Sequence, residues 1–211
     1  MKRIVAMVLL LGAFATTAVL AENRYQYTFR GSWWGMTKDQ VKKTEFSKLD
    51  AANKDRTLLS YFGKINGFPC SILYQFKNGA LVLGSYSIVA EHSNLNDWIN
   101  DYESFKEILE KKYGYPYIDG PRWVDTSKDL SIYRHYAKDP GLAISKNLMQ
   151  LLADWQTDTT EITLNLHSAV DKDGKLINGF ALTILYQPNK NTGIKPVKLE
   201  EGAKLPEPED F

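Results

Sequence analysis

The segment Thr57–Ala90, TLLSYFGKINGFPCSILYQFKNGALVLGSYSIVA, decides the fold. Two Asn-Gly pairs, Asn66-Gly67 and Asn78-Gly79, divide it into three strand-like runs rich in apolar residues. Asn-Gly between such runs is typical of two-residue hairpin turns, because both turn residues adopt positive φ. The segment therefore predicts a three-stranded antiparallel meander.

Two-residue turns also fix which residues face each other across the strands. They predict three apolar pairs: Phe76 with Leu81, Tyr74 with Leu83, and Tyr61 with Ile72. Cys70 alternates with these residues and shares their face. We therefore expect Cys70 to be a small core residue rather than a catalytic thiol.

A second meander is predicted over Gln150–Gln187, with a two-residue turn at Asp158-Thr159 and a third strand at Phe180–Tyr186. The predicted pairs on one face are apolar: Trp155 with Ile162, Ala153 with Leu164, and Leu151 with Leu166. Those on the other face are mainly polar: Gln156 with Glu161, Asp154 with Thr163, and Leu152 with Asn165. This alternation predicts a sheet that is solvated on one side.

A helix precedes each meander. Thr37 and Gln40 form a capping box at the start of the first helix. The second helix, about Leu95–Tyr113, carries an apolar stripe at helical spacing: Trp98, Tyr102, Phe105 and Leu109. We predict an α+β fold of two diverged α-β-β-β units, about residues 31–92 and 93–187. Its antiparallel sheet or sheets have the helices packed on one face.

The amino terminus has the pattern of an export signal, with basic Lys2 and Arg3 before an apolar stretch and small residues before the end at Ala21. We expect cleavage after Ala21, no transmembrane segment in the mature chain, and a periplasmic or secreted location. Residues 22–187 form one predicted domain, and residues 188–211 form a charged tail rich in proline.

Charge and composition exclude several classes of function. Without Lys2 and Arg3 the chain has 24 basic and 25 acidic residues, which argues against a nucleic-acid binder. A single Cys excludes a disulfide framework and a Cys-rich metal site. The sequence contains no glycine-rich phosphate loop and no common serine-nucleophile motif. We therefore predict no cofactor.

The stretch Gly35-Met36-Thr37-Lys38-Asp39-Gln40-Val41, followed by the first meander, resembles the opening of beta-lactamase-inhibitor-like and small outer-membrane-assembly lipoprotein domains. The resemblance covers about Gly35–Ala90. It implies a small periplasmic or secreted module that binds other proteins through a sheet face and loops. The chain departs from the lipoproteins because it has no Cys for lipid attachment at the cleavage point.

The histidines His92, His135 and His167 do not have the spacing of a metal site on one element. Asp171-x-Asp173-Gly174 begins like a calcium loop, but the twelfth position is Leu182 instead of Glu. We therefore predict no metal site, and a polar hairpin turn at Asp171.

Two sets of residues are candidates for binding. The first is aromatic: Trp33, Trp34 and Trp123, the last in a connector that also contains Tyr115, Tyr117 and Tyr133. Adjacent residues of a strand point to opposite faces, so of Trp33 and Trp34 we expect one ring on the sheet and the other under a loop or at an interface. The second set is the polar sheet face: Asp154, Gln156, Glu161, Thr163 and Asn165.

We therefore predict an exported binding or protein-interaction module without a catalytic site, whose partner is a protein or a small ligand of the cell envelope. Two alternatives stay open. One is a hydrolase whose His and carboxylate come together from separate elements, which would place such a pair in a pocket. The other is a component of envelope assembly.

Overall fold

The computed structural model describes residues 28–50, 57–124, 137–171, 173, 175–190 and 192–194. The predicted export signal, His135, Tyr133 and most of the carboxyl-terminal tail lie outside these residues. The helices are α1 (Lys38–Thr44), α2 (Asp97–Tyr113) and α4 (Pro140–Ser145). The strands are β1 (Lys48–Leu49), β2 (Leu58–Ile65), β3 (Phe68–Lys77), β4 (Ala80–Ile88), β5 (Ile118–Trp123), β6 (Met149–Gln156), β7 (Thr160–Val170) and β8 (Leu176–Pro188).

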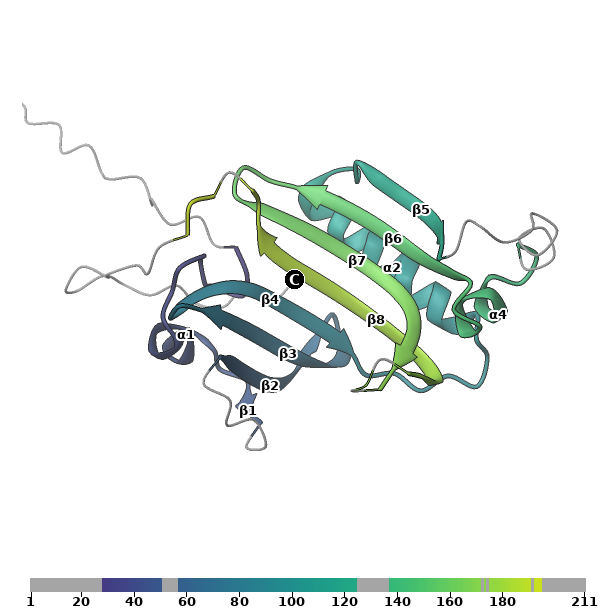
Figure 1. Ribbon diagram of the computed structural model, residues 1–211, viewed down its shortest axis with the longest axis horizontal. Coiled ribbons are helices and arrows are strands. Elements are labelled where there is room, and N and C mark those ends of the chain that lie inside the picture. The colour runs from purple at the N-terminus through teal and green to yellow at the C-terminus, as the bar shows by residue number, and fades with distance from the viewer. Residues whose placement is uncertain are drawn as a thin grey trace, which may run out of the picture.

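All eight strands form one antiparallel sheet in the order β1-β2-β3-β4-β8-β7-β6-β5 (Figure 1). The α+β class is confirmed. Both meanders belong to this sheet, and they meet where β4 pairs with β8. That junction is short: Gly84, Ser85, Tyr86 and Ser87 face Tyr186, Leu185, Ile184 and Thr183. The last of the described strands thus lies in the middle of the sheet.

The first meander has the predicted hairpin turns. Asn66 and Gly67 have φ of 47° and 83°, and Asn78 and Gly79 have φ of 53° and 79°. Both turns therefore have the positive φ values that favour Asn-Gly. The pairs Phe76 with Leu81 and Tyr61 with Ile72 are confirmed.

The predicted pair of Tyr74 with Leu83 is wrong, because Tyr74 faces Gly84. Between Gln75 and Phe76 the register shifts, so that Val82 is an extra residue in β4. Such a β-bulge moves every later residue of the strand by one position. Leu81, on the turn side of the bulge, exchanges backbone hydrogen bonds with Gly35 and Met36.

In the second meander, all six predicted pairs between β6 and β7 are observed. Thr157 donates a backbone hydrogen bond to Thr160 across the turn at 2.8 Å. The tight turn and the strict alternation of apolar and polar residues agree on one register, so no slip occurs.

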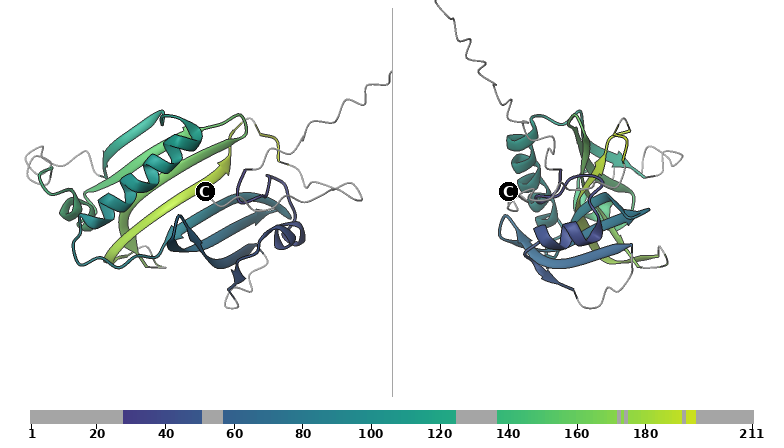
Figure 2. Two further views of the ribbon diagram at one scale, coloured as in Figure 1. Left: turned by 180° about the vertical axis from the view of Figure 1, so that it is seen from behind. Right: turned by 90° about the vertical axis from the view of Figure 1, so that its left-hand side faces the viewer.

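The core lies on one face of the sheet and continues across both halves. Helices α2 and α4 cover this face over β6, β7 and β8 (Figure 2). The predicted stripe of α2 is buried, and Trp98 stacks on Phe180 of β8 with ring centroids 5.6 Å apart. Cys70 is 1% exposed, which confirms it as a core residue.

The segment before α1 covers the core face of β3 and β4. Phe29 packs among three tyrosine rings at centroid distances of 5.0 to 5.2 Å: Tyr74, Tyr86 and Tyr186. These tyrosines come from β3, β4 and β8, so Phe29 lies over the junction between the two meanders.

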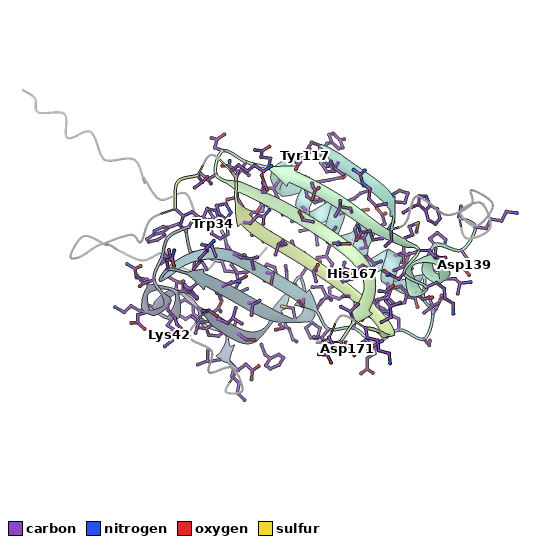
Figure 3. All side chains as sticks on the ribbon, viewed as in Figure 1. Trp34, Lys42, Tyr117, Asp139, His167 and Asp171 are labelled. Carbon is purple, nitrogen blue, oxygen red and sulfur yellow. The ribbon has the colours of Figure 1, made fainter. Side chains whose placement is uncertain are left out.

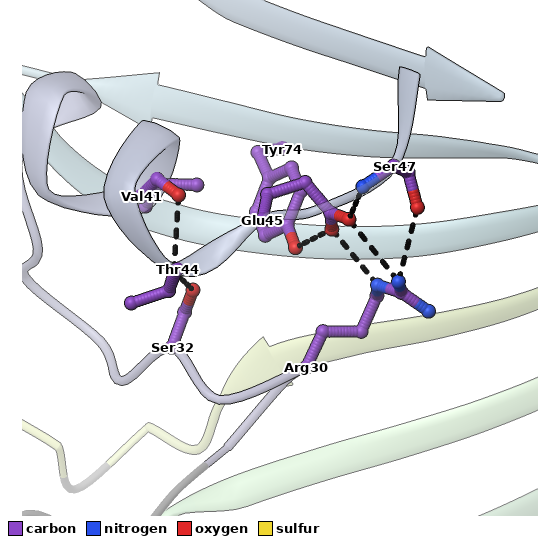
Figure 4. A network of polar contacts seen from close by, with 7 residues as sticks. All are labelled: Arg30, Ser32, Val41, Thr44, Glu45, Ser47 and Tyr74. Carbon is purple, nitrogen blue, oxygen red and sulfur yellow. Dashed lines mark hydrogen bonds and ion pairs between the residues drawn. The ribbon is translucent and has the colours of Figure 1, made fainter. Parts of the chain in front are cut away.

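A buried ion pair joins the residues before α1 to those that follow it. Arg30 and Glu45 form a bidentate contact of 2.8 and 3.1 Å, and both side chains are almost fully buried (Figure 4). The Tyr74 hydroxyl and the Ser47 backbone N–H donate to the same carboxylate at 2.6 and 2.7 Å. Burial alone raises the pKa of a carboxyl group. Here the hydrogen bonds from Arg30 and Tyr74 and the Arg30 charge outweigh burial and lower the pKa of Glu45 below 4.5.

Three elements were not predicted: β1, β5 and α4. The sequence did contain a signal for α4, because Asp139 caps its first turn and Pro140 occupies the first helical position. The predicted domain boundary at residue 187 lies inside β8. Asn189 and Thr192 continue the fold, since both hydrogen-bond to the turn between β6 and β7.

Candidate functional site

The sheet face opposite the core, which we call the outer face, is not covered by any described helix and is turned toward the viewer in Figure 1. Strand alternation and pairing assign its residues. In the central part of the sheet they are Ser71, Leu73 and Gln75 of β3; Leu83, Ser85 and Ser87 of β4; Ala181, Thr183, Leu185 and Gln187 of β8; Glu161, Thr163, Asn165, His167 and Ala169 of β7; and Gln150, Leu152, Asp154 and Gln156 of β6. On the flanking strands the same face carries Lys64 of β2 and Arg122 of β5, which pair with Pro69 and Gln150.

The five predicted polar residues all lie on the outer face, where β6 meets β7. Cross-strand hydrogen bonds hold them in place. Thr163 donates to Asp154 at 2.6 Å, Gln187 donates to Glu161 at 2.9 Å, and Asn165 donates to Gln150 at 3.4 Å. Gln156, at the end of β6, is exposed.

Tyr117 extends the outer face beyond the end of β6. Its backbone N–H donates to the carbonyl of Asp154 at 2.9 Å, and its side chain is 61% exposed (Figure 3). Partial burial, and then the charges of Asp154 and Glu161, raise the pKa of the Tyr117 phenol. This tyrosine was named in the sequence as part of the aromatic connector. The structure brings it next to the predicted polar residues.

Trp33 and Trp34 are both buried, at 5% and 7% exposure. The prediction of opposite faces assumed an extended strand, but the backbone turns here and Met36 donates to the carbonyl of Trp33 at 3.2 Å. The indole N–H of Trp34 donates to the Thr160 hydroxyl at 2.9 Å, at the start of β7. Neither ring is exposed, whereas a side chain that anchors an interface is exposed before the partner binds. Trp34 instead joins the amino-terminal segment to the second meander.

Trp123 lies in β5 opposite Met149, whose side chain is buried in the core. It is half-buried and packs against the core cluster. Trp123 is therefore on the other side of the sheet from the predicted polar residues, so the two predicted sets do not form one surface.

A groove of about 620 Å³ opens between the β4–α2 connection, the end of α4 and the start of β8. We call it the His92 groove. Its apolar walls include Ala90, Leu95, Trp98 and Phe180, and its polar lining includes Glu91, His92, Ser93 and Ser145. The volume is within the range of small-ligand sites, about 300–1,000 Å³.

His92 is paired with a carboxylate at this groove. Its Nε2 atom lies 2.7 Å from Oδ2 of Asp101, and its ring stands edge-on to Trp98 at 5.2 Å. His92 was not among the predicted binding residues, although a His and a carboxylate brought together from separate elements stayed open as an alternative. One signal was available: Asp101 is an acidic residue three positions after Trp98, beside the apolar stripe of α2. A buried carboxylate there requires a partner.

His167 lies on the outer face, and its Nδ1 atom is 2.7 Å from the carbonyl oxygen of Ser168. Among the described residues no group of three or more His, Cys, Asp or Glu side chains is arranged to hold a metal ion. Within the same part of the chain, no helix is both long and apolar enough to cross a membrane.

Comparison with known proteins gives no relative: no family model matches the chain, and no curated protein or solved structure is significantly similar to it.

Proposed function

We propose that the protein is an exported binding module that contacts a protein partner of the cell envelope through its outer face. The observation that supports this is the composition of an uncovered sheet face. Four half-buried leucines, Leu73, Leu83, Leu152 and Leu185, lie among short polar side chains. Among the positions on the five central strands, Asp154 and Glu161 are acidic and none is lysine or arginine. The basic residues Lys64 and Arg122 of the same face lie near strand ends, on the flanking strands β2 and β5.

In its small number of charged residues this face resembles the central part of a protein interface. A solvated sheet face carries polar side chains, and edge strands often carry charged ones such as lysine. The lysines of the first meander lie at strand ends, as Lys64 and Lys77 do.

The size of the outer face also suits a protein partner. The five central strands, about 4.8 Å apart and with roughly six residues of about 3.4 Å rise each, give a face of about 490 Å². The exposed Tyr117, close to Asp154 and Glu161, enlarges it at one end. A standard interface buries about 800 Å² of each partner, so the outer face supplies most of one.

The export part of the proposal rests on the sequence of Met1–Ala21 and on the resemblance of Gly35–Ala90 to periplasmic binding modules. We also infer that the protein consists of two diverged α-β-β-β units. Each half has a helix before three consecutively paired strands, β2-β3-β4 and β6-β7-β8, and this order supports the inference.

Site-specific photocrosslinking in intact cells tests the proposal. A photoreactive residue in place of Thr183, at the centre of the outer face, is expected to give one discrete adduct that mass spectrometry identifies as a protein. The same residue in place of Lys111, exposed on α2, is the matched control and is expected to give none. Absence of an adduct from Thr183, or the same adducts from both positions, would overturn the proposal.

The hydrolase alternative has one observation in its favour, the pair of His92 and Asp101 at a groove. Two features weigh against it. The Ser145 hydroxyl donates to the carbonyl of Leu142 at 2.8 Å and is not hydrogen-bonded to His92. Cys70 is buried in the core. A nucleophile hydrogen-bonded to the histidine is the usual arrangement in such enzymes, so the geometry supports binding better than hydrolysis.

A further inference from the structure

The His92 groove lies on a different side of the sheet from the outer face. Trp98 of α2 stacks on Phe180 of β8 at the core face of the sheet. Gly141 allows α4 to pack closely against the β4–α2 connection, because a Cβ atom there would lie 2.9 Å from Cβ of Leu95. The groove is therefore formed by close packing between three elements.

The hydrogen-bonding direction of His92 follows from its partner. An ionised carboxylate only accepts hydrogen bonds, so the hydrogen between His92 and Asp101 belongs to Nε2. In the neutral imidazole the other nitrogen, Nδ1, then carries a lone pair. No described residue is recorded as a hydrogen-bond partner of this Nδ1 atom. His92 lines the groove with 24% of its side chain exposed, and it offers an acceptor there.

The other polar side chains of the groove also offer acceptors. The hydroxyl hydrogen of Ser145 is used in the 2.8 Å bond to the carbonyl of Leu142, which leaves the lone pairs of its oxygen. Glu91 is exposed at the groove and brings a carboxylate. Of the described residues that line the groove, none is a lysine or an arginine. A site with several acceptors and a negative charge selects a ligand that is rich in donors and positively charged.

We propose that the His92 groove binds a cationic hydrogen-bond donor, an alkylammonium or guanidinium group on an apolar stem. The cation is held by Glu91, His92 Nδ1 and Ser145 Oγ, while the stem lies against the apolar wall formed by Leu95 and Trp98. Long cationic side chains bind in this way: the apolar stem lies on apolar surface, and the charged end contacts polar groups or water. The same chemistry is found in a free amine and in a Lys or Arg side chain of a protein.

Binding of matched probes to the full chain tests this proposal. Pentylamine, pentanol and pentanoate share one stem and differ in the end group. We expect pentylamine to bind at least about tenfold more tightly than the other two, since a charge-assisted contact contributes about one decade or more in affinity. In two-dimensional NMR its addition should shift the indole N–H signal of Trp98. Equal affinities for the three probes, or no binding of any of them, would overturn the proposal.

N-acetyl-lysine methylamide and N-acetyl-arginine methylamide distinguish the two sources of the cation. Tighter binding of these peptide-like probes than of pentylamine assigns the groove to a protein side chain. Tighter binding of pentylamine assigns it to a free amine.

Two variants test which residues of the groove bind the cation. Glu91→Gln keeps the size of an exposed side chain but removes its charge, and we expect about a tenfold loss of pentylamine affinity. Ser145→Ala removes one acceptor, and we expect a smaller loss of about threefold. Glu107→Gln, at an exposed position of α2 that does not line the groove, is the matched control. Unchanged binding in both Glu91→Gln and Ser145→Ala contradicts the proposal.

Discussion

The ring of Phe29 occupies the space above Gly84 in which a side chain would otherwise lie. A Cβ atom on Gly84 would overlap this ring. Gly84 faces Tyr74 on one side and Tyr186 on the other, at the place where β4 joins the two meanders. The missing side chain therefore lets the amino-terminal segment pack directly on the junction of the sheet.

Gly84→Ala is expected to destabilise the protein by about 2 kcal/mol, because overpacking of a well-packed core costs about 1–3 kcal/mol. Urea unfolding measures the change. The double variant with Phe29→Ala should lose less stability than the sum of the two single variants, since the smaller residue removes the overlap. Gly193→Ala is the control, because a Cβ atom there meets nothing within 4 Å. Additive losses would show that the two residues do not compete for space.

Gly79→Ala tests a different role of glycine. Gly79 has φ of +79° and a Cβ atom would contact nothing within 4 Å, so the loss arises from backbone strain alone. We expect about 1 kcal/mol in the same unfolding measurement. A loss as large as that of Gly84→Ala would contradict the type I′ turn as the source of the effect.

Trp34 and Thr160 are expected to stabilise the fold as a pair. Their hydrogen bond of 2.9 Å joins residues 126 positions apart. In a double-mutant cycle with Trp34→Phe and Thr160→Val, the coupling energy should be about 1 kcal/mol, the net value of a buried hydrogen bond. A coupling near zero means that the bond contributes nothing to stability. If the Trp34→Phe variant is as stable as the unchanged protein but no longer gives the photocrosslinked adduct with a partner, Trp34 is an interface residue after all.

The lowered pKa of Glu45 predicts a dependence of stability on pH. The unfolded chain binds a proton at this carboxyl more tightly than the folded protein does, so protonation favours unfolding. The contribution of Glu45 is fully present above its unfolded value near 4.5 and is lost as the pH falls through the lower folded value. We therefore expect the unfolding free energy to decrease on acidification below about pH 4.5.

Glu45→Gln should remove this part of the pH dependence. It should also lower the stability at pH 7 by about 3 kcal/mol, because it leaves the buried Arg30 without its carboxylate. Denaturant unfolding between pH 3 and pH 7 measures both effects, with the exposed Glu107→Gln as the control. An unchanged slope with pH in Glu45→Gln would assign the acid sensitivity to other carboxyl groups.

Local patterns in the sequence predicted the strands and most of their pairing, because short turns fix a register within a few residues. The β6–β7 register follows from Asp158-Thr159 and the alternation around it. The register between β3 and β4 could not be predicted in full. The bulge at Val82 lies where β4 meets the backbone of Gly35 and Met36, a contact between residues far apart in the chain.

The candidate sites divide in the same way. The polar residues of the outer face were predicted together because strand alternation is a local property. The His92 groove was missed because it combines a loop, two helices and the start of β8. The prediction for Trp33 and Trp34 assumed an extended strand. A turn at Gly35 changes the direction of both rings.

The place of β8 between β4 and β7 has a consequence for biosynthesis. Among the described strands the ribosome makes β8 last, so in a nascent chain that ends before Leu176 no strand connects β4 with β7. Each of these two strands then presents an open edge that can pair with another chain. Truncated products are therefore expected to aggregate, and the complete protein forms only when β8 closes the gap.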